Sequence, residues 1–482
     1  MTKGAVALVL HAHLPYVRSA QPGSLEEDWF FQALIECYLP LLETLERASA
    51  DPHQQPKLTI GLSPTLLSLL SDQDLKQRFP DWLNERLDLL PKADPSLRAG
   101  AEHLAATIER HQRAWQSCDG DLIQRFAALQ RQGVVDLLTC GATHGYLPLL
   151  RHHPEAVRGQ LRTAVREHQR LVGERPLGIW LPECAYYEGL DRWMRDAGLR
   201  YAVLDGHGLL HGRPRPRYGV YAPICSRNGV AFFGRDSDAT LPVWSAKDGY
   251  PGDPHYREFH RDLGWDLPIE ELKPLGLDQP RPLGLKLHRV TDHSAPLDRK
   301  RPYEPGVAAE RVKEHAADYL QGRRRQLDQL SAAMDVSPLL VAPFDAELFG
   351  HWWFEGPAFL SQLFQQAPQE GVSFTRLRDV LNNVGQLQLC DPCPSSWGQG
   401  GYHDYWLNDS NAWIIPEWEK ASAAMVQRCS RGVGSEQAMQ WLQQAARELL
   451  LAQSSDWSFI LRAGTTTELA KERVQRHLGR FW

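Results

Sequence analysis

Seven short apolar runs, separated by stretches with helical periodicity, most limit how this chain can fold. Each run is rich in Leu, Val or Ile, as strands buried on both faces of a parallel sheet should be. Helical patterns such as Glu26–Ala50 and Pro154–Val172 separate several of them, and this alternation predicts βα units around a parallel sheet. The predicted strands are Ala5–Leu10, Leu58–Leu62, Val134–Cys140, Leu177–Leu181, Tyr201–Leu204, Leu283–Leu287 and Leu339–Pro343.

Polar or titratable residues follow every predicted strand. An open doubly wound sheet brings together only the residues beside its switch point, whereas a closed barrel gathers all of its strand ends at one rim. So many polar strand ends therefore favour a closed or nearly closed barrel. The residues concerned are His11, His13, Ser63, Thr143, His144, Glu183, Asp205, His207, His288 and Asp345.

Two segments interrupt the alternation. Ser71–Gly133 is charged and helical in pattern, with Pro and Gly as punctuation, which predicts an inserted helical subdomain over about 71–133. Gly206–Pro282 is rich in Gly, Pro, Arg and aromatic residues and shows little periodicity. Long irregular segments of compact domains are usually functional loops, so we expect a loop-rich insertion over about 206–282.

The pattern changes again near Cys390, where a Gly/Trp-rich loop begins. Helical stretches follow over Asn411–Cys429 and Ser435–Gln453. We therefore expect a barrel domain over residues 1–390 and an α-helical C-terminal domain, contributing to the cleft, over residues 391–482.

Composition and charge exclude several classes of protein. The net charge of −6 provides no basic surface for nucleic acid. The apolar run that ends at His11 is too short for a signal peptide, and no stretch reaches the length of a membrane span. Eight Cys residues without framework spacing favour a reducing cytoplasm. Cys390-Asp-Pro-Cys393 is a lone CxxC, for which inert thiols are favoured over redox activity.

Two predicted strands end in a carboxylate surrounded by aromatic side chains. Glu183 lies within Trp180-Leu-Pro-Glu-Cys-Ala-Tyr-Tyr187, and Asp345 leads into Phe349-Gly-His-Trp-Trp353. Cleavage of a glycosidic bond needs a pair of carboxyl groups, and the 16 Trp residues suit stacking on sugar rings. Either acid could instead cap the helix that follows it. Glu347 lies two residues beyond Asp345, so spacing alone leaves the acid of that strand unassigned.

His11-Ala-His13 allows three interpretations. A kink at the strand end would bring both imidazoles to one site, where His144, His207 or Asp205 could complete a set of metal ligands. The two rings could instead form hydrogen bonds to substrate hydroxyls, or be satisfied histidines of the core. The sequence contains neither HExxH nor a tight Asp/His cluster, so a metal is disfavoured.

Several longer motifs occur in order over nearly the whole chain. They are His11-Ala-His-Leu-Pro-Tyr16, Trp180-Leu-Pro-Glu-Cys-Ala-Tyr186, Gly249-Tyr-Pro-Gly-Asp-Pro-His-Tyr-Arg-Glu-Phe259, Ala342-Pro-Phe-Asp-Ala-Glu-Leu-Phe-Gly-His-Trp352, Ser396-Trp-Gly398, Tyr405-Trp-Leu-Asn408 and Ala452-Gln-Ser-Ser-Asp-Trp457. Together these motifs resemble glycoside hydrolase family 57, and most closely its 1,4-α-glucan branching enzymes. The coincidence of several long motifs makes the resemblance specific.

The resemblance implies a distorted (β/α)7 barrel with inserted helices and an all-α C-terminal domain, and it implies no metal or other cofactor. It implies that Glu183 is the nucleophile and Asp345 the general acid/base of a retaining mechanism. The substrate-binding residues expected by motif match are His11, His13 and His144 at the −1 sugar, Arg257 and Trp352, the candidate glucan platforms Trp265, Trp397 and Trp406, and Asp456 from the C-terminal domain.

The implied activity is transfer of an α-1,4-glucan segment to a 6-hydroxyl, which creates an α-1,6 branch in amylose, amylopectin or glycogen. One departure keeps hydrolysis as an alternative. Branching members of the family are expected to carry a tyrosine in a flexible loop near the cleft, but the matching stretch Val230–Val243 has none. A metal-dependent carbohydrate hydrolase or deacetylase and a non-catalytic glucan-binding protein are further alternatives. We expect no nucleic-acid or membrane partner, and a monomer or weak homo-oligomer.

Overall fold

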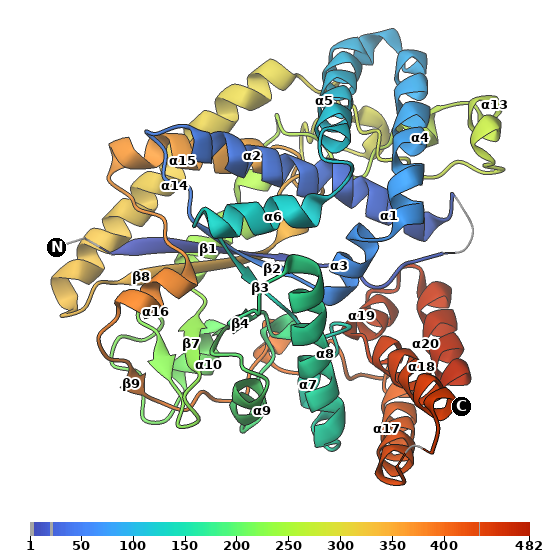
Figure 1. Cartoon of the computed structure of the whole chain (residues 1–482). Coiled ribbons are helices and arrows are strands. Elements are labelled where there is room, and N and C mark those ends of the chain that lie inside the picture. The colour runs from blue at the N-terminus through green and yellow to red at the C-terminus, as the bar shows by residue number, and fades with distance from the viewer. Residues whose placement is uncertain (1–3, 20–22, 433) are drawn as a thin grey trace.

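A ring of parallel strands forms the centre of the computed structural model, which describes residues 4–19, 23–432 and 434–482 (Figure 1). One sheet has the strand order β3-β2-β1-β8, and the other has the order β4-β5-β7-β6-β9. β6 (Ile224–Cys225) and β9 (Gln388–Leu389) extend the second sheet outside the ring. The strands of the ring are β1 (Ala5–Ala12), β2 (Leu58–Leu62), β3 (Val135–Leu138), β4 (Gly178–Ile179), β5 (Tyr201–Leu204), β7 (Ala231–Gly234) and β8 (Leu339–Asp345).

Two backbone contacts join the sheets into a barrel. Thr139 and Ile179 form a parallel bridge between the ends of β3 and β4, and the Trp180 amide donates to the Thr139 carbonyl at 2.8 Å. On the opposite side, the Asp236 amide beyond β7 donates to the Val341 carbonyl of β8 at 2.9 Å. The seven parallel strands of the described chain confirm the predicted distorted (β/α)7 barrel.

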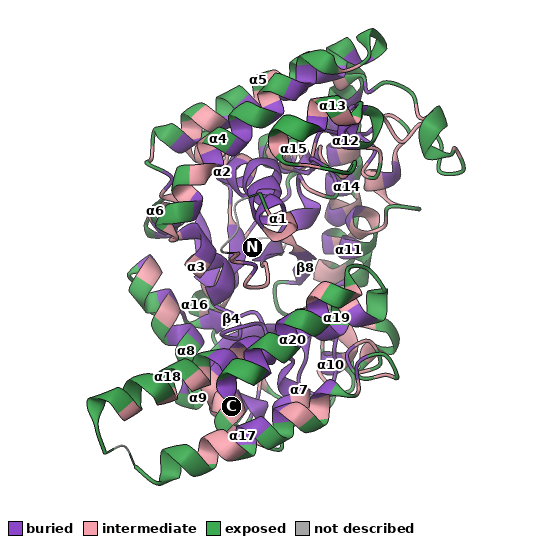
Figure 2. Cartoon of the chain, turned by 90° about the vertical axis from the view of Figure 1, so that its right-hand side faces the viewer, coloured by how far each residue is buried: buried purple, intermediate pink, exposed green. Residues whose placement is uncertain are grey.

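Helices cover the outside of this barrel, and short polar side chains begin several of them. Ser24, Ser63 and Asp72 each accept a hydrogen bond from the backbone amide three residues further on. Exposed residues lie on the outer turns of helices such as α5 and α20, whereas the strands are buried (Figure 2). The helices before the C-terminal region are α1 (Leu25–Ala33), α2 (Leu39–Ala50), α3 (Pro64–Leu70), α4 (Gln73–Leu89), α5 (Arg98–Gln116), α6 (Leu122–Arg131), α7 (Leu147–Leu150), α8 (Pro154–Val172), α9 (Leu190–Asp196), α10 (Gly206–Leu210), α11 (Ser237–Trp244), α12 (Leu263–Asp266), α13 (Ile269–Leu272), α14 (Pro305–Ala333), α15 (Gly356–Glu370) and α16 (Leu377–Asn383).

Two groups of helices are added to the barrel. α4 and α5 form a hairpin that stands away from the strands, whereas α6 packs on β3 and α2 (Figure 1). At the other end of the chain, α17 (Ile414–Ser430), α18 (Glu436–Ala452), α19 (Ser455–Ala463) and α20 (Thr467–Phe481) form a bundle that contacts α7 and α8. None of the helices within the described ranges combines the length and apolarity needed to cross a bilayer.

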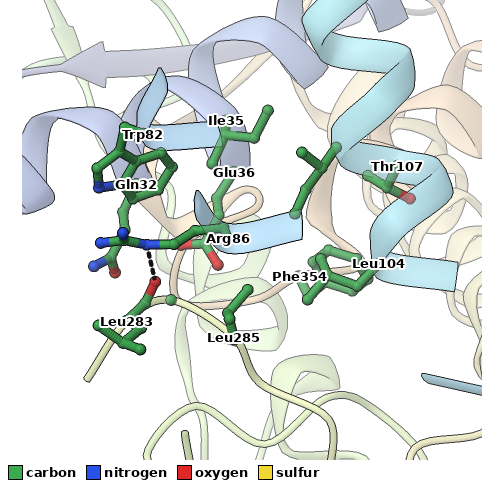
Figure 3. A pocket seen from close by; sticks show the side chains of 12 residues that line it. Gln32, Ile35, Glu36, Trp82, Arg86, Leu104, Thr107, Leu283, Leu285 and Phe354 are labelled. Atoms are coloured by element: carbon green, nitrogen blue, oxygen red, sulfur yellow. Dashed lines mark hydrogen bonds between the residues drawn. The ribbon is translucent and has the colours of Figure 1, made fainter. Parts of the chain in front are cut away.

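One predicted strand is wrong. Leu283–Leu287 has buried leucines but forms no ladder, because its backbone groups bond to side chains and to single backbone amides of Leu263 and Tyr303. Arg86 Nε donates to the Leu283 carbonyl at 3.3 Å (Figure 3), and the Asp262 carboxylate accepts from the amides of Leu283 and Gly284. This segment lines a small cavity against α4 and α5. An extended segment with an apolar sequence pattern therefore need not be a strand of a sheet.

The seventh barrel strand is β7, which lies inside the segment 206–282 that we expected to be irregular. Its four residues, Ala231–Gly234, are buried but too few to produce a periodic signal. With α11 directly after it, the stretch Val230–Val243 is a barrel strand and its following helix rather than a flexible loop. The stretch that lacks tyrosine is therefore part of the barrel wall.

A π-helical turn over Leu34–Tyr38 separates α1 from α2. Such turns widen a helix and occur frequently at functional sites. Tyr38 donates to the Glu347 carboxylate at 2.6 Å, and Glu36 accepts from His351 Nδ1 at 2.6 Å. Both partners belong to the segment that follows β8, so the π-helical turn braces that segment from outside the barrel.

Replacing Gly350 with Ala should destabilise the protein, because an added Cβ would lie 1.7 Å from the Glu36 carbonyl oxygen in the π-helical turn. Gly350 also has a φ of +120°, which residues with a side chain rarely adopt. We expect a loss of ~3 kcal/mol or more, measured as a lower melting temperature. Gly306→Ala on α14, where a Cβ meets no atom within 4 Å, is the control. An unchanged melting temperature for Gly350→Ala would contradict this packing.

Candidate active site

The strand ends, the segment after β8 and the C-terminal helices enclose a cavity of about 370 Å³, a volume typical of small-molecule sites. Eight of the eleven predicted site residues line it, namely His11, His13, His144, Glu183, Asp345, Trp352, Trp397 and Asp456. The remaining wall is formed by Leu14, Pro15, Trp29, Ala33, Glu347, His351 and Phe459. The cavity therefore combines carboxyl groups and imidazoles with flat aromatic surfaces.

Glu183 follows Pro182 beyond β4 and is held in an uncommon backbone conformation. Its φ of 62° and ψ of 24° lie in the left-handed region, which costs about 1–2 kcal/mol for a residue with a Cβ. Both carboxylate oxygens have donors: Trp397 Nε1 lies 2.9 Å from Oε2, and Ser455 Oγ lies 3.0 Å from Oε1. Because both donors come from beyond the barrel strands, the C-terminal part of the chain orients this carboxyl group.

Burial dominates the ionisation of three of the acids in the cavity. Burial raises the pKa of Glu183 to about 7, even though Trp397 donates to its carboxylate. Burial also raises the pKa of Glu347 to about 7. The pKa of Asp345 is raised well above its usual value, by burial and by the neighbouring carboxylates of Glu347 and Glu183. Three like charges this close are unfavourable, which favours the protonated form of Asp345.

Three imidazoles form one wall of the cavity. The rings of His13 and His144 stack with centroids 3.9 Å apart, and His11 stacks on the buried Trp180 at 4.7 Å. His11 Nε2 and His144 Nε2 are 3.0 Å apart and form a hydrogen bond. Burial lowers the pKa of both His11 and His144 well below the usual 6.5, so these two rings are neutral at pH 7.

His13 differs from the other two histidines because it faces an acid. Its Nε2 lies 3.1 Å from each carboxylate oxygen of Asp456. Burial alone would lower the pKa of His13, but Asp456 raises it above the usual value. Burial would likewise raise the pKa of Asp456, but the His13 charge lowers it to about 2. This ion pair joins the residue after β1 to α19 of the C-terminal bundle.

Glu347, which the sequence pattern left unassigned, lies in the cavity as well. Its Oε1 accepts from the Tyr38 hydroxyl at 2.6 Å and from the His13 amide at 3.0 Å. Its position two residues after Asp345 was the available sequence signal. The hydrogen bond of Ser455 to Glu183 has no such signal, because 272 residues separate the two partners.

Three predicted substrate-binding residues do not line the cavity. Arg257 is buried, and its guanidinium pairs with Glu36 at 2.8 Å, so it supports the wall rather than forming it. Trp406 is 2% exposed and stacks on Tyr146 with centroids 4.5 Å apart, so neither ring face is free to hold a sugar. Trp265 lies on α12 and is 52% exposed. The motif match thus identified these three residues in the sequence, but it did not predict that their side chains lie outside the cavity.

Among the described residues, two groups of side chains carry donors that could hold a metal ion: His11, Cys140 and His144 form one, and His13, His144 and Asp456 form the other. Hydrogen bonds already engage both groups, and an ion would have to replace the His11–His144 and His13–Asp456 contacts. Burial also raises the pKa of Cys140 well above its usual value, which disfavours the thiolate that binds metals. These side chains therefore fit a hydrogen-bonding wall better than a metal centre.

The His13–Asp456 pair should make stability depend on pH. The lowered pKa of Asp456 gives a contribution that is complete above about pH 4 and lost as pH falls through about 2. The raised pKa of His13 gives a contribution that is complete below about pH 6.5 and lost as pH rises through the raised value. The melting temperature should therefore fall from pH 6 to pH 9.

Asp456→Asn should lower the free energy of unfolding by about 2 kcal/mol at pH 6. Between pH 6 and pH 9 its melting temperature should fall less than that of the wild-type protein. Glu468→Gln, which alters an exposed pair with Lys471 in the same bundle, is the control and should retain the wild-type pH dependence. An Asp456→Asn variant with the full pH dependence would contradict the assignment of the pair.

Comparison with known proteins shows which family the chain that forms this cavity matches. Residues 7–391 match the family model described as Glycosyl hydrolase family 57. Residues 417–482 match the model described as 1,4-alpha-glucan branching enzyme, C-terminal. The two matches together cover the barrel and the helical bundle that meet at the cavity.

Individual relatives agree with the family models. A 1,4-alpha-glucan branching enzyme of Thermococcus kodakarensis is 32% identical over 98% of this chain and 72% of its own length. The structure of the alpha-amylase AmyC from Thermotoga maritima is 35% identical, with 99% of this chain and 92% of that chain covered and a TM-score of 0.91. The GH57-type branching enzyme from Pyrococcus horikoshii is 32% identical, with 98% and 88% covered and a TM-score of 0.89. The chain belongs to glycoside hydrolase family 57.

Proposed function

We propose that this protein is a 1,4-α-glucan branching enzyme that works by retaining double displacement. The observation that carries the proposal is the composite cavity. The barrel contributes the acids Glu183 and Asp345, and the helical bundle contributes Asp456 to the same cavity and the buried Ser455 hydroxyl to Glu183. The match of that bundle to the branching-enzyme C-terminal model supports transfer rather than hydrolysis.

In the first half of the reaction, the Glu183 carboxylate attacks the anomeric carbon of an α-1,4-linked glucose. The protonated Asp345 gives its proton to the departing glycosidic oxygen, so the shortened glucan leaves with a free 4-hydroxyl. A covalent ester between the transferred glucan and Glu183 results. Because its pKa is raised, the Asp345 carboxyl group carries the proton that this step requires.

In the second half, Asp345 is ionised and acts as the base. It takes the proton of a 6-hydroxyl on an acceptor glucan, whose oxygen attacks the ester carbon and releases Glu183. Inversion at each step retains the α configuration and leaves an α-1,6 branch. The imidazole wall of His11, His13 and His144 would line the place of the reacting sugar.

Hydrolysis is the second candidate function, and one observation favours it. The Thermotoga maritima relative with 35% identity is described as an alpha-amylase. Glu183 and Asp345 serve water and a glucan hydroxyl equally well, so the aromatic walls decide which acceptor reaches the ester. Trp352 is 44% exposed and Phe459 is 45% exposed at this cavity, and both offer surface to a second sugar chain.

We extend the proposal to the organisation and setting of the protein. A catalytic barrel over 1–390 and a C-terminal domain over 391–482 would act as one unit on amylose, amylopectin or glycogen. The net charge of −6 supports the absence of a nucleic-acid partner. A cytoplasmic location and a monomeric or weakly oligomeric state remain predictions.

Incubation with amylose should lower iodine staining and create α-1,6 linkages with few new reducing ends. Glu183→Gln should reduce this turnover ~10⁴-fold or more, because the ester can no longer form. Glu188→Gln, at an exposed position five residues further along the chain, is the matched control and should keep wild-type turnover. Reducing ends that rise without new branches would overturn branching in favour of hydrolysis, and retained turnover in Glu183→Gln would refute the nucleophile.

Trp352→Ala should raise the KM for amylose about five- to tenfold with a smaller change in kcat, because the exposed indole stacks on the sugar without touching the reacting bond. Trp441→Ala is the control, since Trp441 is 68% exposed on α18 and does not line the cavity. Initial rates over a range of amylose concentrations give both constants. Equal KM values for the two variants would argue against Trp352 as a platform.

A further inference from the structure

We propose that Ser455 is a positioning residue that joins the His11–His144 pair to Glu183 in one directional hydrogen-bond chain. The proposal rests on the proposed function in one respect, namely that Glu183 is the nucleophile. Ser455 is the first residue of α19, so the last link of the chain is supplied by the C-terminal bundle rather than by the barrel.

The chain has three links, and each has hydrogen-bond length. His11 Nε2 lies 3.0 Å from His144 Nε2, His144 Nδ1 lies 2.8 Å from Ser455 Oγ, and Ser455 Oγ lies 3.0 Å from Glu183 Oε1. Ser455 is fully buried, and His11 and His144 are 2% and 4% exposed. Water therefore does not compete for these links, and each donor must find its acceptor within the chain.

Chemistry fixes the direction of the chain when Glu183 is ionised. A carboxylate only accepts hydrogen bonds, so the Ser455 hydroxyl must donate its single proton to the hydrogen bond with Glu183. Ser455 Oγ then accepts from His144, which places a proton on His144 Nδ1 and leaves Nε2 bare. His11 must therefore donate from Nε2. Both imidazoles are neutral, as their lowered pKa values require.

The opposite direction leaves two groups unsatisfied. Ser455 would donate to His144 Nδ1 and could no longer donate to Glu183. His11 would accept at Nε2 and carry its proton on Nδ1, which is buried without a partner among the described residues. A buried N–H without an acceptor is rarer and less favourable than a bare lone pair. The environment of His11 thus points to the same direction as the charge of Glu183.

The backbone holds Ser455 in place for this role. Its amide donates to the His144 carbonyl at 3.0 Å, and the preceding residue, Ser454, forms an antiparallel bridge with Gly145. His144 itself has a φ of 56°, in the left-handed region that residues with a side chain seldom occupy. Two main-chain contacts thus fix the serine hydroxyl relative to the imidazole that it must meet.

The link to Glu183 matters most while the carboxylate is charged. A donor to the ionised form lowers a pKa, and the Ser455 hydroxyl has this effect on Glu183. Other groups that act on the Glu183 charge are Asp456, which raises its pKa, and His13, which lowers it; the acid Asp345 lines the same cavity. No proton moves along the chain in this proposal, because its function is to hold the nucleophile ionised and aimed.

The tautomers test the direction of the chain in the unaltered protein. Two-bond proton–nitrogen spectra of the full chain, labelled with 15N-histidine and recorded at pH 9 where Glu183 is ionised, report which ring nitrogen carries the proton. His11→Gln and His144→Gln assign the two signals. We expect the Nε2–H form for His11 and the Nδ1–H form for His144. A proton on His144 Nε2 would overturn the proposal, and this measurement needs no Ser455 variant to fold.

Ser455→Ala tests the effect on the nucleophile. Loss of the donor should move the acid limb of the kcat/KM–pH profile upward by about one pH unit and leave the His144 tautomer unfixed. Ser458→Ala is the control, because Ser458 is buried on the same helix and its hydroxyl has no partner among the described residues. Ser455→Thr, which retains the hydroxyl, should restore the profile. An acid limb in Ser455→Ala that coincides with that of Ser458→Ala would overturn the proposal.

The two proposals fail separately. If the wild-type protein turns over no glucan, the branching function is wrong, but the histidine spectra still decide whether the chain runs from His11 to Glu183. If glucan is branched and the tautomers are reversed, the function stands and the role of Ser455 does not.

Discussion

The burial of acidic groups around one cavity is the constraint on which the rest of this structure depends. Desolvation raises the pKa of Glu183, Glu347 and Asp345, and each charge makes the next less favourable. An acid that must ionise therefore needs donors. Trp397 and Ser455 supply them to Glu183, while Asp345 is left to keep its proton.

Those donors come from the parts of the chain that surround the barrel. The π-helical turn contributes the Tyr38 hydroxyl to Glu347, the segment beyond β9 contributes Trp397, and α19 contributes Ser455 and Asp456. The strand ends alone would present buried carboxyl groups with too few partners. The C-terminal bundle is thus part of the electrostatics of the site, as well as a covering over one side of it.

Most of the fold could be predicted from the sequence because buried parallel strands are simple, continuous apolar runs. Six of the seven predicted runs overlap strands of the barrel. The exceptions share a cause in tertiary contacts. Leu283–Leu287 is apolar and buried, but the side chains of Asp262 and Arg86 and two isolated backbone amides bond to its backbone. Ala231–Gly234 is a strand because β5 and β6 pair with it.

The site was predictable where a residue follows a strand, and less so elsewhere. Glu183 and Asp345 are marked by the apolar runs before them, and parallel strands carry such residues to one rim. Trp406 shows the limit of motif matching, because its burial against Tyr146 depends on packing that no local pattern encodes. Ser455 shows the limit of spacing, since a hydrogen bond across 272 residues leaves no trace in the sequence nearby.

The left-handed backbone at Glu183 sets stability against chemistry at a single position. Glycine is the residue that such a conformation suits best, and glycine has no carboxyl group. Selection for a more stable chain and selection for the proposed nucleophile therefore act in opposite directions at this position. A homologue that no longer catalysed the reaction could replace this glutamate with glycine and so remove the backbone strain. A glycine at this position would therefore indicate a homologue that keeps the barrel but has lost the activity.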